Sequence, residues 1–421
     1  MPVSKIKSIK AREIRDSRRN PTIEVSLRTE KGVFRASVPS GASKGKYEAI
    51  ELRDGGKRLK GKGVLKAVNN INKIIAPKLI GKNPEKQKEI DGILIKLDGT
   101  KDKSKLGANA ILAVSLVCCR AGASSQNLPL YHYIANLGEV GPPLKLRKLA
   151  RPCFNVINGG RHAANDLDFQ EFMVVPRQTS FRKNLEIGIH IYRELKRIIR
   201  ENYGAEALNL GDEGGFAPPI NAPEQALDLI MEAAKNLGCH RKIDIILDVA
   251  ATQFFKEGIY KTNIGSFNQE ELSTYYLNLL KKYPIIGVED PFSEDDWPGW
   301  KELKSKVKSQ KSKALIIGDD LLVTNIERIK KARKENVCNA AIIKINQIGT
   351  VTQALGAAKL CQKYGWKMIV SHRSAETKDD FIADFAAGLG ADFIKSGAPF
   401  PVERMAKYNR LLKIEQELNK H

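Results

Sequence analysis

The sequence of 421 residues predicts a closed β/α barrel preceded by a second, smaller domain. The first observation is length, since a chain of this size exceeds one ordinary hydrophobic core and leaves room for a barrel of about 200 residues or more. The second is a change in the sequence pattern after residues 137–152, a segment rich in Pro, Gly and charged residues. The third is a series of short apolar runs, separated by helical stretches, that occupies the chain after that segment. Such strands, alternating with helices, are typical of a parallel sheet that helices cover.

The part before residue 137 shows strand patterns first and helical patterns afterwards. β-Branched and charged residues alternate over residues 20–40, NPTIEVSLRTEKGVFRASVPS, and Glu30-Lys31-Gly32 interrupts the alternation. Two such runs with a short Gly-containing break predict a β-hairpin. Helical periodicity then predicts helices around residues 62–76, 84–96 and 107–125.

In the second part, six apolar runs each end at a polar or charged residue, and successive ends lie 23 to 41 residues apart. This spacing suits one strand and one helix per unit. Together with earlier strands, the six units predict a closed barrel, in which chemistry gathers at the carboxyl ends of the strands. The residues at these ends are Asp248, Glu289, Asp319, Lys344, His372 and Lys395.

Three of the strand ends carry carboxylates, namely Asp248, Glu289 and Asp319. Taken singly, each would be read as a helix cap or a surface carboxylate. Three that converge on one mouth would repel one another and raise a pKa unless a cation neutralises them. A hard divalent cation with all-oxygen ligands resolves this, which favours Mg²⁺ over zinc.

Two lysines, Lys344 and Lys395, occupy apolar strands, where an unpaired ammonium group is costly. One reading is an edge-strand lysine that reaches solvent. The other is a desolvated lysine with a lowered pKa that acts as a base. Removing a proton α to a carboxylate needs such a base, together with dense positive charge to hold the enediolate.

Two glycine-rich stretches supply further acids. Residues 155–176 contain His162, Gln170 and Glu171, and residues 208–219 contain Glu213. Glycines let the backbone approach a ligand closely. An isolated His or Glu there would be structural, but beside the strand-end set a second acid indicates a general acid for a departing hydroxide.

Residues 40–49, SGASKGKYEA, look like a phosphate-cradling loop but do not fit one. A P-loop has four residues between its glycines and then Lys followed by Ser or Thr. Here three residues separate Gly41 from Gly45, and Tyr47 follows the lysine. The stretch therefore argues against nucleotide binding.

The charge of the chain is unusually positive, +22 overall, with 27 Lys and Arg against 12 Asp and Glu in residues 1–110. A basic surface could bind RNA weakly, although no nucleic-acid motif accompanies it. Six sparse cysteines without a CxxC pair favour reduced thiols. No apolar run reaches the roughly 18 residues of a membrane helix, and no signal peptide is visible, so we expect a cytoplasmic protein.

At these residues the sequence resembles the enolase family over nearly its whole length. The stretches that carry the resemblance include SGASKGKYEAIELRD, NVINGGRHA, GDEGGFAPP, LDVAATQFF, VEDPFSEDDW, GDDLLVTN, KINQIGTVT, SHRSAET and AKYNRLLKIEQEL. The resemblance implies an N-terminal α+β cap domain (1–138) that carries a lid loop, and a modified TIM-like β/α barrel (139–421). It also implies a homodimer or a higher homo-oligomer.

The resemblance further implies the reversible, Mg²⁺-dependent dehydration of 2-phosphoglycerate to phosphoenolpyruvate. Lys344 matches the base that takes the C2 proton, Glu213 matches the acid that assists loss of the C3 hydroxyl, and Glu171 and His162 complete the catalytic set. The residues that match substrate contacts are His162, Gln170, Glu171, Glu289, Asp319, Lys344, His372, Arg373, Ser374 and Lys395. Asp248, Glu289 and Asp319 match the ligands of the first Mg²⁺, and Ser43 matches a ligand of a second Mg²⁺ that arrives with substrate.

The sequence departs from the family pattern at four places. Arg19 replaces a glycine, where it could strain the backbone, and Lys44, Arg161 and the pair Pro401-Val402 also differ. Two other functions stay open at this point. One is a different acid-sugar dehydratase or cycloisomerase with the same three carboxylates, and the other is an RNA-binding module in which catalysis is secondary or lost.

Overall fold

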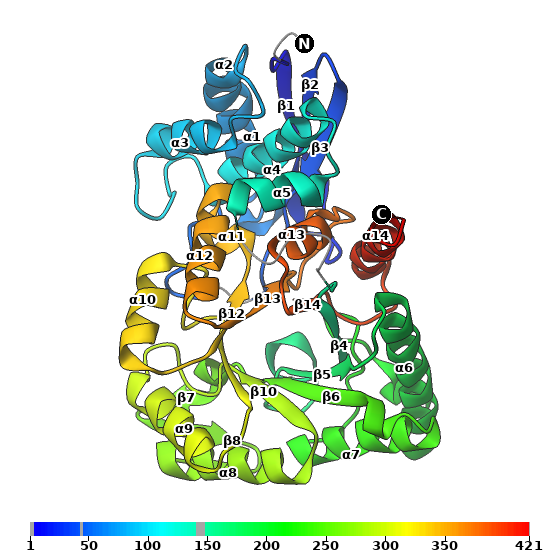
Figure 1. Ribbon diagram of the computed structural model, residues 1–421. Helices are drawn as coiled ribbons and strands as arrows, with labels where there is room; N and C mark the ends of the chain where they lie inside the picture. Colours follow the sequence, from blue (N-terminus) through cyan, green and yellow to red (C-terminus); the bar gives the residue numbers. More distant parts are fainter. Residues whose placement is uncertain (1–3, 43–44, 140–147, 421) are drawn as a thin grey trace.

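The computed structural model describes residues 4–42, 45–139 and 148–420 and contains an N-terminal lobe beside a closed barrel of eight strands (Figure 1). The predicted fold class is therefore confirmed. The predicted domain boundary after residue 138 falls at the end of helix α5 (Leu130–Gly138) and stays a prediction.

The N-terminal lobe is built on a three-stranded antiparallel sheet of β1 (Ser8–Arg15), β2 (Pro21–Thr29) and β3 (Gly32–Ser37). Thr29 pairs with Gly32, so Glu30 and Lys31 form a two-residue hairpin connection. Alternating burial along β2 turns its apolar side chains towards the helices of the lobe. The predicted hairpin is confirmed.

α-Helices and a π-helical turn follow the sheet in the described part of this lobe, and all of them except α5 lie close to the three predicted helical ranges. Their bounds are α1 (Leu65–Asn69), a π-helical turn (Asn70–Ile75), α2 (Ala76–Leu79), α3 (Gln87–Asp98), α4 (Ala108–Ser125) and α5. Helix α4 is long and apolar enough to span a membrane, but 83% of it is buried inside the fold. It packs on β2 and β3, so it is the core helix of this lobe.

The barrel closes in the order β10-β11-β12-β13-β14-β4-β5-β6. Its strands are β4 (Arg151–Asn158), β5 (Glu171–Pro176), β6 (Ile243–Asp248), β10 (Ile285–Glu289), β11 (Leu315–Gly318), β12 (Ala340–Ile343), β13 (Lys367–Ser371) and β14 (Phe393–Lys395). All six predicted strands are present and neighbouring ones pair in parallel. Strand β5 alone runs antiparallel to both neighbours, a feature that the apolar runs did not reveal.

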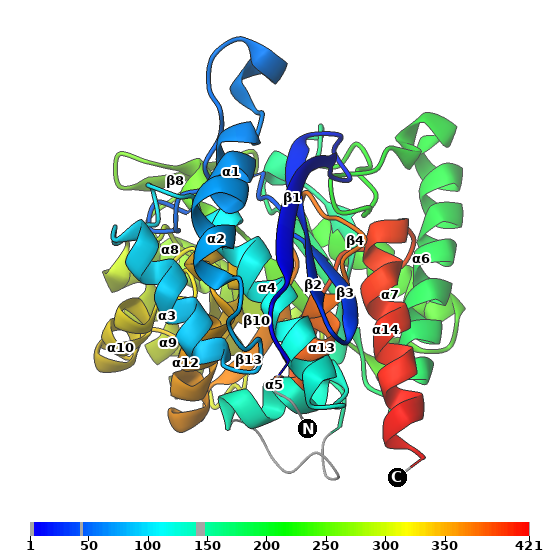
Figure 2. The same cartoon turned by 90° about the horizontal axis from the view of Figure 1, so that it is seen from above.

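Helices surround the barrel, and those of the N-terminal lobe lie across one end of it (Figures 1 and 2). The barrel helices are α6 (Phe181–Tyr203), α7 (Pro223–Asn236), α8 (Gln269–Lys282), α9 (Trp297–Ser309), α10 (Ile326–Glu335), α11 (Ile345–Ile348), α12 (Val351–Lys363), α13 (Phe381–Leu389) and α14 (Val402–Leu418). A small sheet of β7 (Phe255–Lys256), β8 (Ile259–Thr262) and β9 (Gly265–Phe267) follows β6. Apolar side chains fill the barrel interior, among them Met173, Ile246, Ile342 and Phe393.

Polar contacts join the two lobes. Arg120 on α4 pairs with Asp379 at 2.9 Å and with Asp380 at 2.8 Å. Asp91 on α3, which is 1% exposed, accepts the backbone N–H of Thr352 in the first turn of α12 at 2.9 Å. A carboxylate is favourable at a helix N-terminus, so Asp91 links the N-terminal lobe to a barrel helix.

The departures from the family pattern have different structural settings. Arg19 adopts φ 60°, a left-handed conformation that glycine tolerates better, so backbone strain there stays a prediction with the required geometry. Arg161 is exposed beside the buried His162. Pro401 caps α14 and Val402 begins it, whereas Lys44 lies outside the described residues. The six cysteines are free and buried, as expected for reduced thiols.

Candidate active site

A pocket opens at the barrel mouth, and almost every residue proposed from the sequence lines it. Those residues are His162, Gln170, Glu171, Glu213, Asp248, Asp319, Lys344, His372, Arg373, Ser374 and Lys395. Glu289 reaches the same group through Lys395. Ser43 lies outside the described residues, although its neighbours Gly41 and Ala42 line the pocket.

Strand register explains why these side chains meet. Asp248 ends β6 and pairs with Glu289, which ends the parallel β10. Asp248 also pairs with Glu171, the first residue of β5. Because β5 runs antiparallel, its first residue lies at the same mouth as the last residues of its neighbours. Within two residues of two of these strand ends the backbone is left-handed, with φ 48° at Ala250 and 42° at Asp290. Such conformations cost roughly 1–2 kcal/mol and tend to occur at functional sites.

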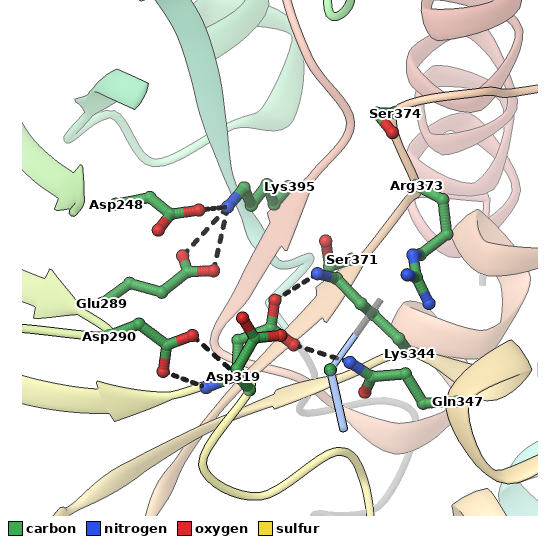
Figure 3. Close-up of polar contacts among 12 residues, drawn as sticks. Asp248, Glu289, Asp290, Asp319, Lys344, Gln347, Ser371, Arg373, Ser374 and Lys395 are labelled. Atoms are coloured by element: carbon green, nitrogen blue, oxygen red, sulfur yellow. Dashed lines mark hydrogen bonds and ion pairs between the residues drawn. The ribbon is translucent and has the colours of Figure 1, made fainter. Parts of the chain in front are cut away.

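Lys395 is the centre of the carboxylate group (Figure 3). Its Nζ lies 2.9 Å from Glu171 Oε2, 2.9 Å from Asp248 Oδ2 and 3.0 Å from both carboxylate oxygens of Glu289. The residue is 2% exposed. Burial lowers the pKa of Lys395, but the three carboxylates outweigh it and hold that pKa well above its usual value. Lys395 is therefore a permanent cation in this arrangement.

Lys344 belongs to a second pair. It follows β12, and its Nζ contacts Asp319 Oδ2, while Gln347 Nε2 donates to Asp319 Oδ1 at 2.9 Å. Burial lowers the pKa of Lys344, but the charge of Asp319 outweighs burial, and the pKa is raised. The lowered pKa expected from the sequence is wrong for this arrangement, because the sequence pattern did not reveal that Asp319 would pair directly with the lysine.

Asp290 organises the turn that carries Asp319. Its two carboxylate oxygens accept the backbone N–H groups of Asp319 at 2.9 Å and Asp320 at 2.8 Å (Figure 3). Burial and the charge of Asp319 raise the pKa of Asp320 to about 8. Asp290, Asp319 and Asp320 have carboxylate oxygens within 4.8 Å of one another, close enough to hold one metal ion.

The three expected metal ligands do not form one such cluster in the described residues. Asp248 and Glu289 share Lys395, whereas Asp319 joins Lys344. The donor set is nonetheless all oxygen, as a hard divalent cation requires. Burial and the neighbouring Asp248 keep the pKa of Glu289 well above its usual value, because the single ammonium group of Lys395 cannot balance three carboxylates. The residues therefore fit a divalent cation, which would replace the lysine ammonium groups as the partner of these carboxylates.

His162 and Glu213 adjoin the carboxylate group in the same pocket and meet it at Glu171. His162 Nδ1 lies 3.3 Å from Glu171 Oε1 and 3.7 Å from Glu213 Oε1. Burial and the charge of Glu213 raise the pKa of Glu171. For Glu213, burial acts upwards, but His372 and His162 outweigh it and hold its pKa well below the usual value. Two neighbouring carboxyl groups whose pKa values are shifted in opposite directions are suited to acid–base chemistry.

The remaining predicted residues form the wall that follows β13. The guanidinium of Arg373 binds Glu48 in a fork, with Nη1–Oε2 at 2.8 Å and Nη2–Oε1 at 3.1 Å. Ser374 Oγ accepts the N–H of Ala42 at 2.6 Å, which ties the N-terminal lobe to the same wall. Across the pocket, Gln170 Nε2 donates to Asp248 Oδ2 at 3.5 Å.

Sequence reasoning missed several residues that complete the site. Asn155 Nδ2 donates to Glu213 Oε2 at 3.1 Å, Glu48 holds Arg373, and Arg404 contacts His372 from helix α14. Asp290 was also missed, although it directly follows Glu289 at a strand end. Strand-end position could have revealed Asp290, but nothing in the local sequence indicated Glu48 or Arg404.

Fold and site together define a β/α-barrel enzyme with buried lysines and carboxylates arranged for acid–base chemistry beside a cation. Residues 147–421 match the family described as "Enolase, C-terminal TIM barrel domain", and residues 6–134 match "Enolase, N-terminal domain". "Enolase" of Mastigamoeba balamuthi is 52% identical over 431 residues, covering 99% of this chain and 96% of that protein. "Enolase B" of Dictyostelium discoideum is 52% identical over 429 residues, covering 99% and 95%. The chain belongs to the enolase family, and it is a lyase of the phosphopyruvate hydratase class.

Proposed function

We propose that this protein catalyses the glycolytic enolase reaction, the reversible dehydration of 2-phosphoglycerate to phosphoenolpyruvate. The observation that carries the proposal is the single pocket lined by Lys344, Glu213, Arg373 and Lys395. A base, an acid, a buried cation and an anion-binding guanidinium in one pocket are the groups that this reaction needs.

Lys344 takes the proton from C2, and Glu213 assists loss of the C3 hydroxyl. Lys344 must first give up its own proton, a change that its ion pair with Asp319 opposes. Glu171, with its raised pKa, keeps a proton available beside Glu213. Lys395 offers fixed positive charge to the substrate carboxylate, and Arg373 and Ser374, with His372 beside them, bind the phosphate.

Mg²⁺ is the proposed cofactor, held by Asp248, Glu289 and Asp319. When bound, it would supply positive charge that stabilises the enediolate. A second Mg²⁺ that arrives with the substrate is proposed from the family resemblance. Its expected ligand Ser43 is outside the described residues.

We further propose a cytoplasmic homodimer or higher homo-oligomer. Six free, buried cysteines support a reducing compartment. The charge of +22 supports a weak association with RNA, which a gel shift at increasing salt concentrations would test.

The test is formation of phosphoenolpyruvate from 2-phosphoglycerate, followed by ultraviolet absorbance with Mg²⁺ and with a chelator. Lys344→Ala and Glu213→Gln should each lower kcat by about 10²–10⁴-fold, the usual effect of losing a general base or acid. Lys367→Ala, at an exposed lysine that begins β13, is the matched control and should keep kcat. Glycerate without its phosphate should not react.

A wild-type protein that forms no metal-dependent product would refute the proposed function. Turnover of unphosphorylated acid sugars would instead indicate the dehydratase or cycloisomerase alternative. Near-normal kcat in Lys344→Ala would refute the assignment of the base alone.

A further inference from the structure

Arg404, in the first turn of α14, is a buried arginine that no catalytic proposal has used. It is 1% exposed, and neutral oxygens hold its guanidinium. Nη1 donates to the carbonyl of Arg373 at 2.7 Å, and Nη2 donates to the carbonyls of Ser374 at 2.7 Å and Asp212 at 3.1 Å. The same Nη1 contacts Nδ1 of His372. Arg404 therefore joins the wall after β13 to the loop that carries Glu213.

The contact with His372 has only one chemical reading. A guanidinium donates hydrogen bonds and accepts none, and it stays protonated in proteins. Nδ1 of His372 must therefore be the acceptor and carry no proton. The proton of the neutral ring is then on Nε2, which lies 3.0 Å from Glu213 Oε2.

We propose that Arg404 is a positioning residue of the active site, which holds His372 as the neutral Nε2–H tautomer and so aims a hydrogen-bond donor at Glu213. This inference rests on the proposed function, because Glu213 is the acid of that reaction. Arg404 touches no reacting atom and acts through His372.

The two oxygens of Glu213 then have different roles. Asn155 Nδ2 already donates to Oε2 at 3.1 Å. His372 Nε2 lies 3.0 Å from the same atom, so Oε2 is the oxygen that faces both nitrogen groups. Oε1, 3.7 Å from His162 Nδ1, is left as the oxygen through which Glu213 would act on the C3 hydroxyl.

The charges around His372 agree with a neutral ring. Its facing groups are Glu213, Arg404 and Glu376, and Glu376 is itself paired with Lys407 at 2.8 Å. Burial lowers the pKa of His372, Glu213 opposes this, and Arg404 adds to the lowering, which brings the pKa to about 4. Unperturbed histidine titrates near pH 6.5, so His372 keeps its Nε2–H donor across the neutral range.

Nitrogen-15 NMR of the histidine-labelled protein tests the tautomer directly. In the wild type we expect an unprotonated Nδ1 and a protonated Nε2 at His372, with no titration between about pH 5 and pH 8. In Arg404→Met we expect a mixture of tautomers and a midpoint that moves up into this range. We also expect kcat to fall by about 10–100-fold, as for a misaligned general acid, with a shifted acid limb of its pH profile and KM changed less than about threefold.

Lys407→Met is the matched control. Lys407 lies one turn further along α14, is also 1% exposed, and pairs with Glu376 rather than touching His372. It should lower stability as Arg404→Met does, yet leave Nδ1 of His372 unprotonated, because Lys407 does not touch the ring. Arg404→Lys keeps the positive charge but loses the two-nitrogen geometry of the guanidinium. Compared with Arg404→Met, it should partly restore the low titration midpoint of His372 and restore little of kcat.

A protonated Nδ1 in the wild-type spectrum would overturn the proposal, and that measurement needs no variant to fold. Identical tautomers and pH profiles in Arg404→Met and Lys407→Met would also overturn it, because they would reduce Arg404 to a structural role. Failure of the proposed function is a separate outcome, since an inactive wild-type protein would still report its His372 tautomer.

Discussion

Lys395→Met should destabilise the metal-free protein, by an amount that grows with pH. The substitution keeps the length of the side chain and removes the ammonium group that lies within 3.0 Å of Glu171, Asp248 and Glu289. Removing one partner of a buried ion pair costs roughly 3–5 kcal/mol, because the other charge is left uncompensated. The carboxyl groups can relieve this cost by binding protons, so the loss depends on pH.

The sign follows from where the protons are held. Burial already raises the pKa of both Glu171 and Glu289 in the folded protein. In the variant these carboxyl groups keep their protons in the folded state, whereas the unfolded chain releases them above its ordinary pKa. The free energy of unfolding therefore falls as pH rises, by up to about 1.4 kcal/mol per pH unit for each additional proton held. We expect a modest loss near about pH 5 and a loss of roughly 3–5 kcal/mol near about pH 8.

Urea denaturation followed by tryptophan fluorescence and circular dichroism, in the presence of a chelator, measures this loss. The two probes should give coincident transitions, as two-state unfolding requires. Lys367→Met is the control, because Lys367 pairs with Asp392 at the surface and such pairs contribute at most about 1 kcal/mol. Added Mg²⁺ should recover more stability in Lys395→Met than in the wild type. A loss below about 1 kcal/mol that does not change with pH would refute the reasoning.

Two further predictions concern stability. Arg19→Gly should raise the free energy of unfolding by about 0.5–1 kcal/mol. Glycine relieves roughly 1–2 kcal/mol of strain at the left-handed position, but it also makes the unfolded chain more flexible, which offsets part of this gain. An unchanged urea midpoint would show that φ 60° is unstrained there. Asp91→Leu should lower the free energy of unfolding by about 2–3 kcal/mol, because Thr352 N–H and the Ser115 hydroxyl lose a buried acceptor. The control is Glu89→Leu, at an exposed position on the same helix. An equal loss of stability in the two variants would contradict this prediction.

Local sequence was enough to locate most of the site. Apolar runs that end in Asp248, Glu289, Asp319, Lys344 and Lys395 showed which residues stand at strand ends, because a buried strand must be apolar until it reaches the mouth. The change in sequence pattern after residue 137 indicated where the N-terminal lobe gives way to the barrel. The left-handed backbone at Arg19 was anticipated only from the family resemblance, which has glycine there.

Tertiary structure decided what each of these groups does. The antiparallel direction of β5 brings Glu171 beside Asp248, and strand direction depends on which neighbours pair rather than on the pattern of one run. The same closure puts Asp319 against Lys344 and raises the pKa of that lysine, reversing the shift that desolvation alone predicts. Arg404 reaches His372 across 32 positions of sequence, a separation at which no periodicity survives. The sequence by itself thus determined which residues reach the barrel mouth. Their partners, and therefore their charges, were decided by how distant segments pack, because ion pairs and hydrogen bonds depend on distances that only the folded chain defines.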